Sequence, residues 1–208
     1  MTRQQTIETF LEALSSRQPV PGGGGASAFA GALGTALGLM VGNLTVGKKK
    51  YAAVEADVSH MMERLEGLQR EMVALIDEDA RVFAPLAAAY GLPAGTQEER
   101  AHKDRVMEEN LLHASLVPLK IMELAVEVLG ILEELEEKGS VMAVSDVGVA
   151  VQFARTALTG AVMNVYINTK SMKDRQKAEE INQRAEAAVT EGIPLAERIY
   201  GRVTERLK

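Results

Sequence analysis

Apolar side chains recur every three or four residues along most of the chain, which is the spacing that gives a helix one hydrophobic face. The longest such stretch covers residues 52–90, where positions such as Val58, Leu65 and Met72 are apolar and charged residues lie between them. Residues 6–15 repeat the pattern on a smaller scale. Alternation of apolar and polar residues, which would indicate strands, is not convincing anywhere, and no segment repeats with the period of a solenoid. The pattern predicts a protein made of helices.

Capping residues mark the ends of a further long helix. Thr96 and Glu99 have the spacing of a capping box, in which each residue's side chain bonds the backbone N–H of the other. The helix that they open is predicted to reach about Lys138, and Gly139 follows it.

Prolines interrupt three of the helical patterns. Pro85 and Pro118 lie inside predicted helices and should kink them, because proline lacks a backbone donor and crowds the preceding turn. In the last helical segment, residues 172–208, the sequence Gly192-Ile193-Pro194 predicts a break.

Two segments carry few charges and have small residues along one face. Residues 26–46 have no charge, and small residues occupy every fourth position, namely Ala26, Ala30, Gly34, Gly38 and Gly42. Residues 145–171 are similar. A transmembrane span is one interpretation, but small residues gain little on transfer into hydrocarbon, which favours a buried helix with a flat ridge for close packing. The predicted fold class is all-α, an antiparallel up-and-down helix bundle with long, partly kinked helices.

Composition adds limits to this picture. The 208 residues are 47% hydrophobic and 25% charged, as expected of one globular domain covering 1–208. A net charge of −6 and an aromatic content of 4% argue against nucleic acid as a partner. Cysteine is absent, and acidic and amide residues stand near the start where a signal peptide would be apolar. We expect a cytoplasmic protein with no membrane partner.

The most unusual run in the chain is a proline followed by four glycines. Pro21, Gly22, Gly23 and Gly24 precede the first uncharged helix, and glycines let a backbone approach a ligand beside the free N–H groups of a helix start. The alternative is a simple turn. A turn needs only one or two glycines, so a binding loop is an equal interpretation.

Charged candidate residues lie just after the first uncharged helix and within the long helix that follows it. Lys48, Lys49, Lys50 and Tyr51 could hold the carboxylates of an acidic substrate, or could be a solvated helix end. Asp77 and Asp79 point to different faces of one helix, so either one could face a cleft as a general acid or base. The alternative for Asp77 is an ion pair with Arg81 at i,i+4.

The second, weakly charged helix carries polar residues at both ends. Ser145 and Asp146 have the appearance of an N-cap. Asn164 and Asn168 share one apolar face, and buried amides need partners such as a ligand heterocycle or another helix. Asp146 and Asn164 are separated by about 27 Å along a helix at 1.5 Å per residue. A small substrate cannot touch both in one subunit, so the ligand is long or a dimer combines opposite ends of two chains.

Metal chemistry is not expected. The three histidines, His60, His102 and His113, lack the spacing of metal ligands, and no carboxylate cluster resembles a di-iron bundle. Nucleotide-binding loops and nucleophile elbows are absent as well.

Taken in order, six motifs resemble the formimidoyltetrahydrofolate cyclodeaminase and methenyltetrahydrofolate cyclohydrolase family. They are Pro-Gly-Gly-Gly-Gly-Ala-Ser-Ala at 21–28, Gly-Lys-Lys-Lys-Tyr at 47–51, Asp-Glu-Asp-Ala-Arg-Val-Phe at 77–83, Val-Pro-Leu at 117–119, Ser-Asp-Val-Gly-Val-Ala at 145–150 and Gly-Ala-Val-Met-Asn-Val-Tyr-Ile-Asn at 160–168. One departure stands at Gly139, after which family members commonly carry Asn and this chain has Ser140.

The resemblance implies an all-helical homodimer, or a higher homo-oligomer, that binds a tetrahydrofolate derivative, with or without a polyglutamate tail. It implies no other cofactor and no metal. The expected reaction is conversion of 5-formimidoyltetrahydrofolate to 5,10-methenyltetrahydrofolate and ammonia, or hydrolysis of the methenyl compound to 10-formyltetrahydrofolate.

Site roles come from the same resemblance. Asp77 or Asp79, with Asp146, become candidate acids and bases; the lysines at 48–50 would hold carboxylates, and Asn164 and Asn168 would orient the pterin or support its pocket. Ser145 belongs to the Ser-Asp motif. A bundle that binds folate or another anion without catalysis is the alternative function, and a membrane-associated helical protein that dimerises through its small-residue helix is a weaker one.

Overall fold

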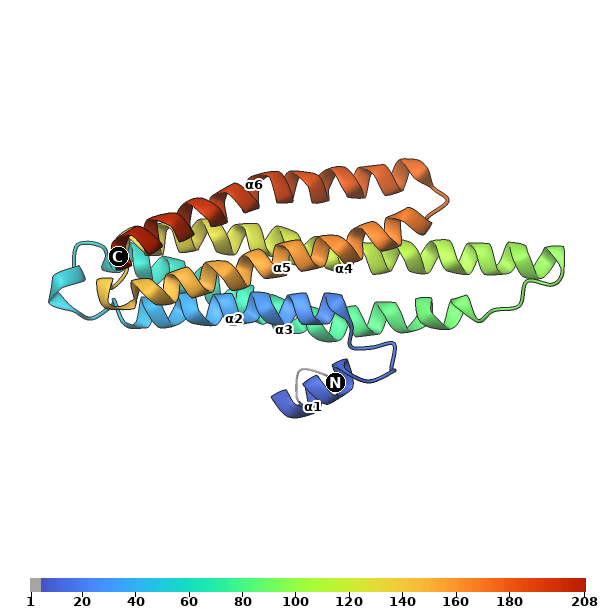
Figure 1. The fold of residues 1–208 in the computed structure, drawn as a ribbon, viewed down its shortest axis with the longest axis horizontal. Helices are drawn as coiled ribbons and strands as arrows, with labels where there is room; N and C mark the ends of the chain where they lie inside the picture. Colours follow the sequence, from blue (N-terminus) through green and yellow to red (C-terminus); the bar gives the residue numbers. More distant parts are fainter. Residues whose placement is uncertain (1–4) are drawn as a thin grey trace.

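The computed structural model describes residues 5–208, which fold into long helices with no strand among them. In chain order the elements are α1 (Ile7–Leu14), α2 (Gly23–Asn43), the 3-10 turn η2 (Lys49–Tyr51), α3 (Glu55–Tyr90), α4 (Gln97–Lys138), the 3-10 turn η3 (Val141–Ala143), α5 (Val144–Ser171) and α6 (Arg175–Leu207). Helices α2 to α6 run up and down beside one another, while α1 lies apart at the side of the bundle (Figure 1). The predicted fold class is confirmed.

Helix α5 packs against α2, α4 and α6 and leaves one face exposed. Small residues make this packing close. A Cβ on Gly34 would lie 3.0 Å from the carbonyl oxygen of Ala150, so the backbones of α2 and α5 nearly touch there. A Cβ on Gly38 would lie 3.0 Å from Leu65 of α3. The small-residue ridge predicted for residues 26–46 is therefore a helix-packing surface.

The predicted helix ends are largely confirmed. Thr96 caps α4, accepting from the N–H of Glu99, whose carboxylate accepts in return from the N–H of Thr96. Gly139 follows the last residue of α4. Thr6 caps α1 in the same way, through the N–H of Thr9.

Two predictions about helix ends are wrong. Helix α6 continues through Pro194 without a break, because Gly192 is needed for packing: a Cβ there would lie 2.5 Å from a methyl carbon of Leu158 on α5. The close contact between α5 and α6 therefore outweighs the local helix-breaking tendency. Ser145 and Asp146 do not cap α5, which begins at Val144 with no side-chain cap.

Two segments, Gly23–Asn43 and Val141–Ser171, are long and apolar enough to cross a membrane by length and composition. In the bundle 56% of the most apolar part of the first and 50% of the second is buried. Since the core helix of a soluble protein passes the same test, these segments are weak evidence for a span.

Candidate functional site

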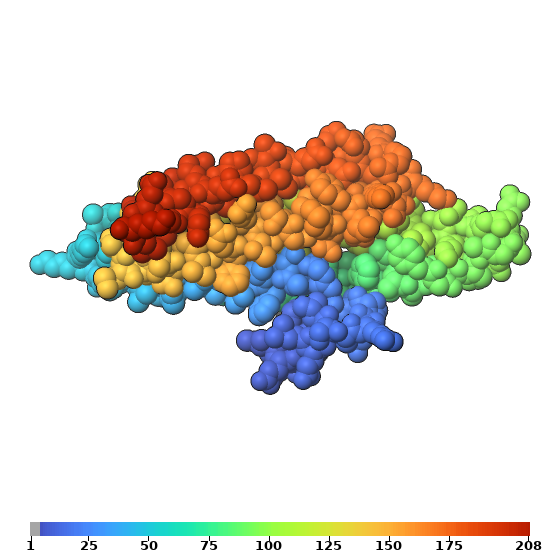
Figure 2. Space-filling model, in the orientation of Figure 1, coloured from blue at the N-terminus to red at the C-terminus, as the bar shows by residue number. Residues whose placement is uncertain are grey.

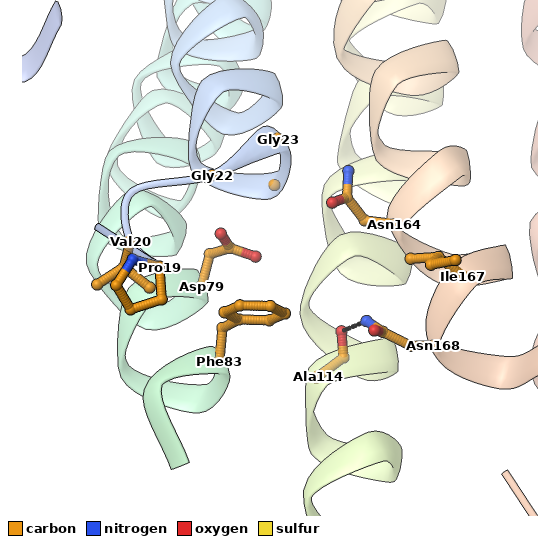
Figure 3. A pocket seen from close by; sticks show the side chains of 11 residues that line it. Pro19, Val20, Gly22, Gly23, Asp79, Phe83, Ala114, Asn164, Ile167 and Asn168 are labelled. Carbon is orange, nitrogen blue, oxygen red and sulfur yellow. Dashed lines mark hydrogen bonds between the residues drawn. The ribbon is translucent and has the colours of Figure 1, made fainter. Parts of the chain in front are cut away.

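A pocket lies where the first turn of α2 meets α3, α4 and α5 (Figure 3). Its volume is about 90 Å³. Its walls are formed by Pro19, Val20, Gly22, Gly23, Gly24, Asp79, Phe83, Ala114, Asn164, Ile167 and Asn168. The glycine run thus lines a pocket, and a cis peptide between Val20 and Pro21 lies just before it. Ligand binding by this loop remains a prediction.

The carboxylate of Asp79 is the charged group of this pocket. Its side chain comes from the middle of α3 and is 9% exposed. One carboxylate oxygen, Oδ2, accepts a hydrogen bond of 2.8 Å from the N–H of Gly25 in the first turn of α2. A Cβ on Gly24 would lie 2.0 Å from the other oxygen. Glycine at position 24 is therefore what lets the carboxylate approach the helix start.

Burial changes the acidity of this group. Loss of hydration raises the pKa of Asp79 from 3.8 to about 6, although the hydrogen bond from Gly25 lowers it in part. A carboxyl group with a pKa near neutrality can both take up and release a proton under physiological conditions.

Two amides from α5 face Asp79 across the pocket (Figure 3). Asn164 donates through Nδ2 to the carbonyl oxygen of Gly160, 3.0 Å away, and its amide lies against Gly23. Asn168 is buried and donates through Nδ2 to the carbonyl oxygen of Ala114 on α4, 2.8 Å away. The predicted partner helix for a buried amide is therefore present for Asn168.

The predicted lysines and Tyr51 lie at the other end of α2. Helix α2 has 21 residues, so its ends are about 30 Å apart at 1.5 Å per residue. Tyr51 accepts a hydrogen bond through its hydroxyl oxygen from the N–H of Val141, which lowers the pKa of the Tyr51 hydroxyl. The ammonium of Lys50 lies 5.3 Å from the centre of the Tyr51 ring. The lysines at 48–50 are exposed.

Two hydrogen bonds from backbone N–H groups to side-chain hydroxyl oxygens join this end to the segment just before α5. The N–H of Ser140 donates to Thr45, and that of Val141 donates to Tyr51. In α5, Ser145 is exposed and Asp146 is half-buried in the first turn. The predicted residues therefore form two separate groups. One is the glycine-loop pocket, and the other, which we call the lysine end, comprises the lysines at 48–50, Tyr51, Ser145 and Asp146.

The structure brings together Gly22, Gly23, Gly24, Asp79, Asn164 and Asn168. Pro21 is buried beside them without lining the pocket, and Asp77 is not among the lining residues. Arg81 forms two hydrogen bonds with Glu78. Sequence reasoning missed Phe83 and Ile167, although helical spacing could have found them, since Phe83 follows Asp79 by four residues and Ile167 follows Asn164 by three.

No group of three or more His, Asp or Glu side chains within residues 5–208 is arranged to hold a metal ion. Metal independence remains a prediction. The pocket instead offers one carboxylate, two amides and the N–H groups of a helix start, which are suited to binding and proton transfer at a polar organic molecule.

Fold and pocket together define a helical bundle with a pocket that holds one carboxylate and two amides beside the start of α2. The chain belongs to the formiminotransferase-cyclodeaminase family, whose model matches residues 6–187. It is 44% identical, over the full length of both proteins, to a methenyltetrahydrofolate cyclohydrolase of Methylorubrum extorquens. It is 31% identical to the formimidoyltransferase-cyclodeaminase of Rattus norvegicus, covering 97% of this chain and 37% of the rat protein.

A solved structure has the same fold. Formiminotetrahydrofolate cyclodeaminase from Thermotoga maritima superposes with a TM-score of 0.84 and 25% identity, covering 100% of this chain and 98% of that one.

Proposed function

We propose that this chain is an enzyme acting on a tetrahydrofolate derivative, and that it hydrolyses 5,10-methenyltetrahydrofolate to 10-formyltetrahydrofolate. The observation that carries the choice of reaction is the 44% identity, over both full lengths, to a protein named methenyltetrahydrofolate cyclohydrolase. The pocket at the glycine loop supports the proposal, because it supplies a buried carboxylate where a water molecule can be deprotonated.

In this mechanism Asp79 is the proton-transfer group. Water adds to the cationic methenyl carbon while its proton passes to the Asp79 carboxylate, giving a neutral carbinol bridged between N5 and N10. The C–N5 bond then breaks as Asp79 returns the proton to N5, and the hydroxyl proton leaves to solvent as the formyl C=O forms on N10. The net reaction consumes one water and releases one proton. A pKa of about 6 suits a carboxyl group that must first accept a proton and then donate it.

Cyclodeamination is the second candidate. It is favoured by the names of the rat relative and of the Thermotoga structure. Here N10 attacks the formimidoyl carbon and its proton passes to the formimidoyl nitrogen. Asp79 in its protonated form then delivers the second proton, with which ammonia leaves as the methenyl cation forms. Both reactions pass through a tetrahedral carbon between N5 and N10, so one pocket can accommodate either.

A homodimer would unite the two groups of predicted residues. Helices α2 and α5 lie side by side on one face of the bundle (Figure 2) and expose apolar side chains along it, including Leu33, Met40, Val149, Met163 and Ile167. Met163 and Ile167 are 61% and 62% exposed. An uncharged apolar face of this kind fits a second copy of the chain.

A two-fold axis across this face would place the lysine end of one protomer beside the glycine-loop pocket of its partner. In that arrangement Asp146 and Tyr51 approach the pocket from the second chain. The lysines at 48–50 then bind the carboxylates of the substrate's glutamate tail, whether single or multiple. Within one chain the lysines and the glycine-loop pocket are separated by the length of α2, about 30 Å. In the proposed dimer the lysines of one chain lie beside the pocket of the other.

The deciding experiment follows the absorbance of the methenyl chromophore with purified protein. A hydrolase accelerates its loss from 5,10-methenyltetrahydrofolate above the spontaneous rate, and a deaminase produces it from 5-formimidoyltetrahydrofolate. Asp79→Asn should abolish the activity that is found. Absence of both activities from a protein that still binds folate would support the non-catalytic alternative.

A further inference from the structure

Proline at position 118 leaves one carbonyl group of α4 without its regular hydrogen-bond donor. In an α-helix the carbonyl of residue 114 accepts from the N–H of residue 118, and proline has no N–H. The proline ring also crowds that carbonyl, which therefore cannot keep its regular direction. Helix α4 nevertheless continues from Gln97 to Lys138 with Pro118 inside it. The carbonyl of Ala114 needs a donor from outside its own helix.

That donor comes from α5. Asn168 donates through Nδ2 to the carbonyl oxygen of Ala114, 2.8 Å away (Figure 3). Ala114 is 3% exposed and Asn168 is 6% exposed, and Pro118 is buried as well. A carbonyl left without a donor in such surroundings would lower the stability of the fold. The side-chain amide on α5 thus replaces the backbone N–H that α4 lacks.

The other two prolines inside the helices of residues 5–208 create no such need. Pro85 in α3 frees the carbonyl of Arg81. Pro194 in α6 frees that of Thr190. Arg81 and Thr190 are exposed residues, so water is at hand to bond their carbonyls. Only the proline of α4 frees a carbonyl on a buried residue that also lines a pocket.

We propose that Pro118 is a positioning residue of the glycine-loop pocket. Because residue 118 supplies no N–H, the carbonyl of Ala114 stays available to Asn168, and their hydrogen bond fixes where the Asn168 amide lies. Ala114 and Asn168 both line the pocket, whereas Pro118 does not. The proline therefore acts through them, setting the wall that α4 and α5 share. The effect on substrate binding rests on the proposed function, but the placement of the amide does not.

Exchange of the Asn168 amide protons with solvent tests this placement directly. Pro118→Ala restores an N–H, so the carbonyl of Ala114 returns to its own helix and the amide is released. With asparagine-selective ¹⁵N labelling, and Asn168→Ala to identify the signal, exchange should become at least about tenfold faster in Pro118→Ala. Pro194→Ala is the matched control and should change it less than about twofold. An unchanged rate in Pro118→Ala, or an equal increase in both variants, would overturn the proposal.

A thermodynamic cycle gives a second measurement of the same contact. Asn168→Ala leaves the carbonyl of Ala114 without a donor only while residue 118 is proline. We expect this substitution to lower the Tm by about 6 °C in the wild-type background and by less than about 3 °C in the Pro118→Ala background. Equal losses would contradict the role of Pro118. Pro118→Val restores the same N–H with a larger side chain and takes the place of the alanine variant if that variant does not fold.

Kinetics separate this inference from the proposed function. With methenyltetrahydrofolate, Pro118→Ala should raise KM about tenfold and change kcat less than about threefold, because the pocket wall is displaced while Asp79 is not. Pro194→Ala should change neither. An unchanged KM in a variant whose amide is released would overturn the positioning role. A wild-type protein without turnover would refute the proposed enzyme, and amide exchange would still decide whether Pro118 places Asn168.

Discussion

The carboxylate of Asp79 fills the space that a side chain on Gly24 would need: its oxygen Oδ1 lies 2.0 Å from the position of a Cβ on residue 24. The absence of a side chain at this position is thus what allows a carboxylate on α3 to reach the start of α2. The relationship ties a feature of the sequence, a run of four glycines, to the charged group of the pocket.

A methyl group at position 24 should therefore displace the carboxylate. We expect Gly24→Ala to reduce kcat/KM by at least about a hundredfold while the helical content is kept. Gly25→Ala is the control, since its Cβ would be 3.7 Å from its nearest neighbours and its N–H to Asp79 remains. Steady-state kinetics and circular dichroism of both variants provide the comparison. Equal activity of the two would mean that the carboxylate position is unimportant.

Asp79→Asn should make the protein more stable at neutral pH as well as inactive. The folded-state pKa is raised, so the folded protein binds its proton more tightly than the unfolded chain, and the ionised form weakens folding as the pH rises from about 4 to about 6. Replacing the group with a neutral amide removes this loss, which amounts to at most about 3 kcal/mol. Urea unfolding at pH 4 and pH 7.5 should show the difference between variant and wild type only at the higher pH.

The pH dependence of hydrolysis should follow the same group. If Asp79 accepts the proton of water, kcat/KM is high where it is ionised and falls as the pH decreases through about 6. A pH–rate profile with methenyltetrahydrofolate, corrected for spontaneous hydrolysis, measures this limb. A rate that stays level down to pH 5 would assign the base to another residue.

A mixture of two inactive variants should recover activity if the site is shared between chains. Asp79→Asn and Asp146→Asn damage different ends of one protomer, and a mixed dimer would contain one intact site. Co-refolding equal amounts should restore about a quarter of wild-type turnover, because half of the dimers are mixed and each has one working site. No recovery, with mixed dimers demonstrated by mass spectrometry, would place both groups in one chain or exclude Asp146.

Stability should depend on a buried carboxylate far from the pocket. The Glu136 side chain is 1% exposed; Arg202 bonds its Oε2 at 2.8 Å, and Arg206 lies 2.8 Å from Oε1. Arg202→Met should lower the free energy of unfolding by about 3 kcal/mol, because it leaves a buried charge partly uncompensated. Arg198→Met, which removes a more exposed pair with Glu133, should cost less than about 1 kcal/mol. Denaturant unfolding of both variants tests the contrast.

Periodicity and capping were sufficient to predict the helices and their order, because patterns of three and four residues report directly on which face is buried. They failed at Pro194, where a tertiary contact of Gly192 with Leu158 decides the local structure. The pocket was predictable in part. The glycine run and the amides were singled out by their unusual local context, whereas the meeting of Asp79 with Gly25 depends on how α3 crosses α2, which no local pattern contains.

Choosing Asp79 over Asp77 likewise required the structure. Both belong to one acidic run, and they differ only in the direction in which the helix turns them. Asp79 is buried against glycines, and Asp77 is half-buried elsewhere on α3.

The straight run of α2 also has a consequence for how this fold can vary. Its 21 residues begin at the glycine-loop pocket and end just before the lysine end, so the helix sets the spacing between the two. Inserting one residue would lengthen that spacing by about 1.5 Å and rotate the far end by about 100°. In a dimer that joins the two ends, such a change would misalign both sites at once. Relatives that share this assembly should therefore tolerate insertions in the loops around α2 but keep the length of the helix itself.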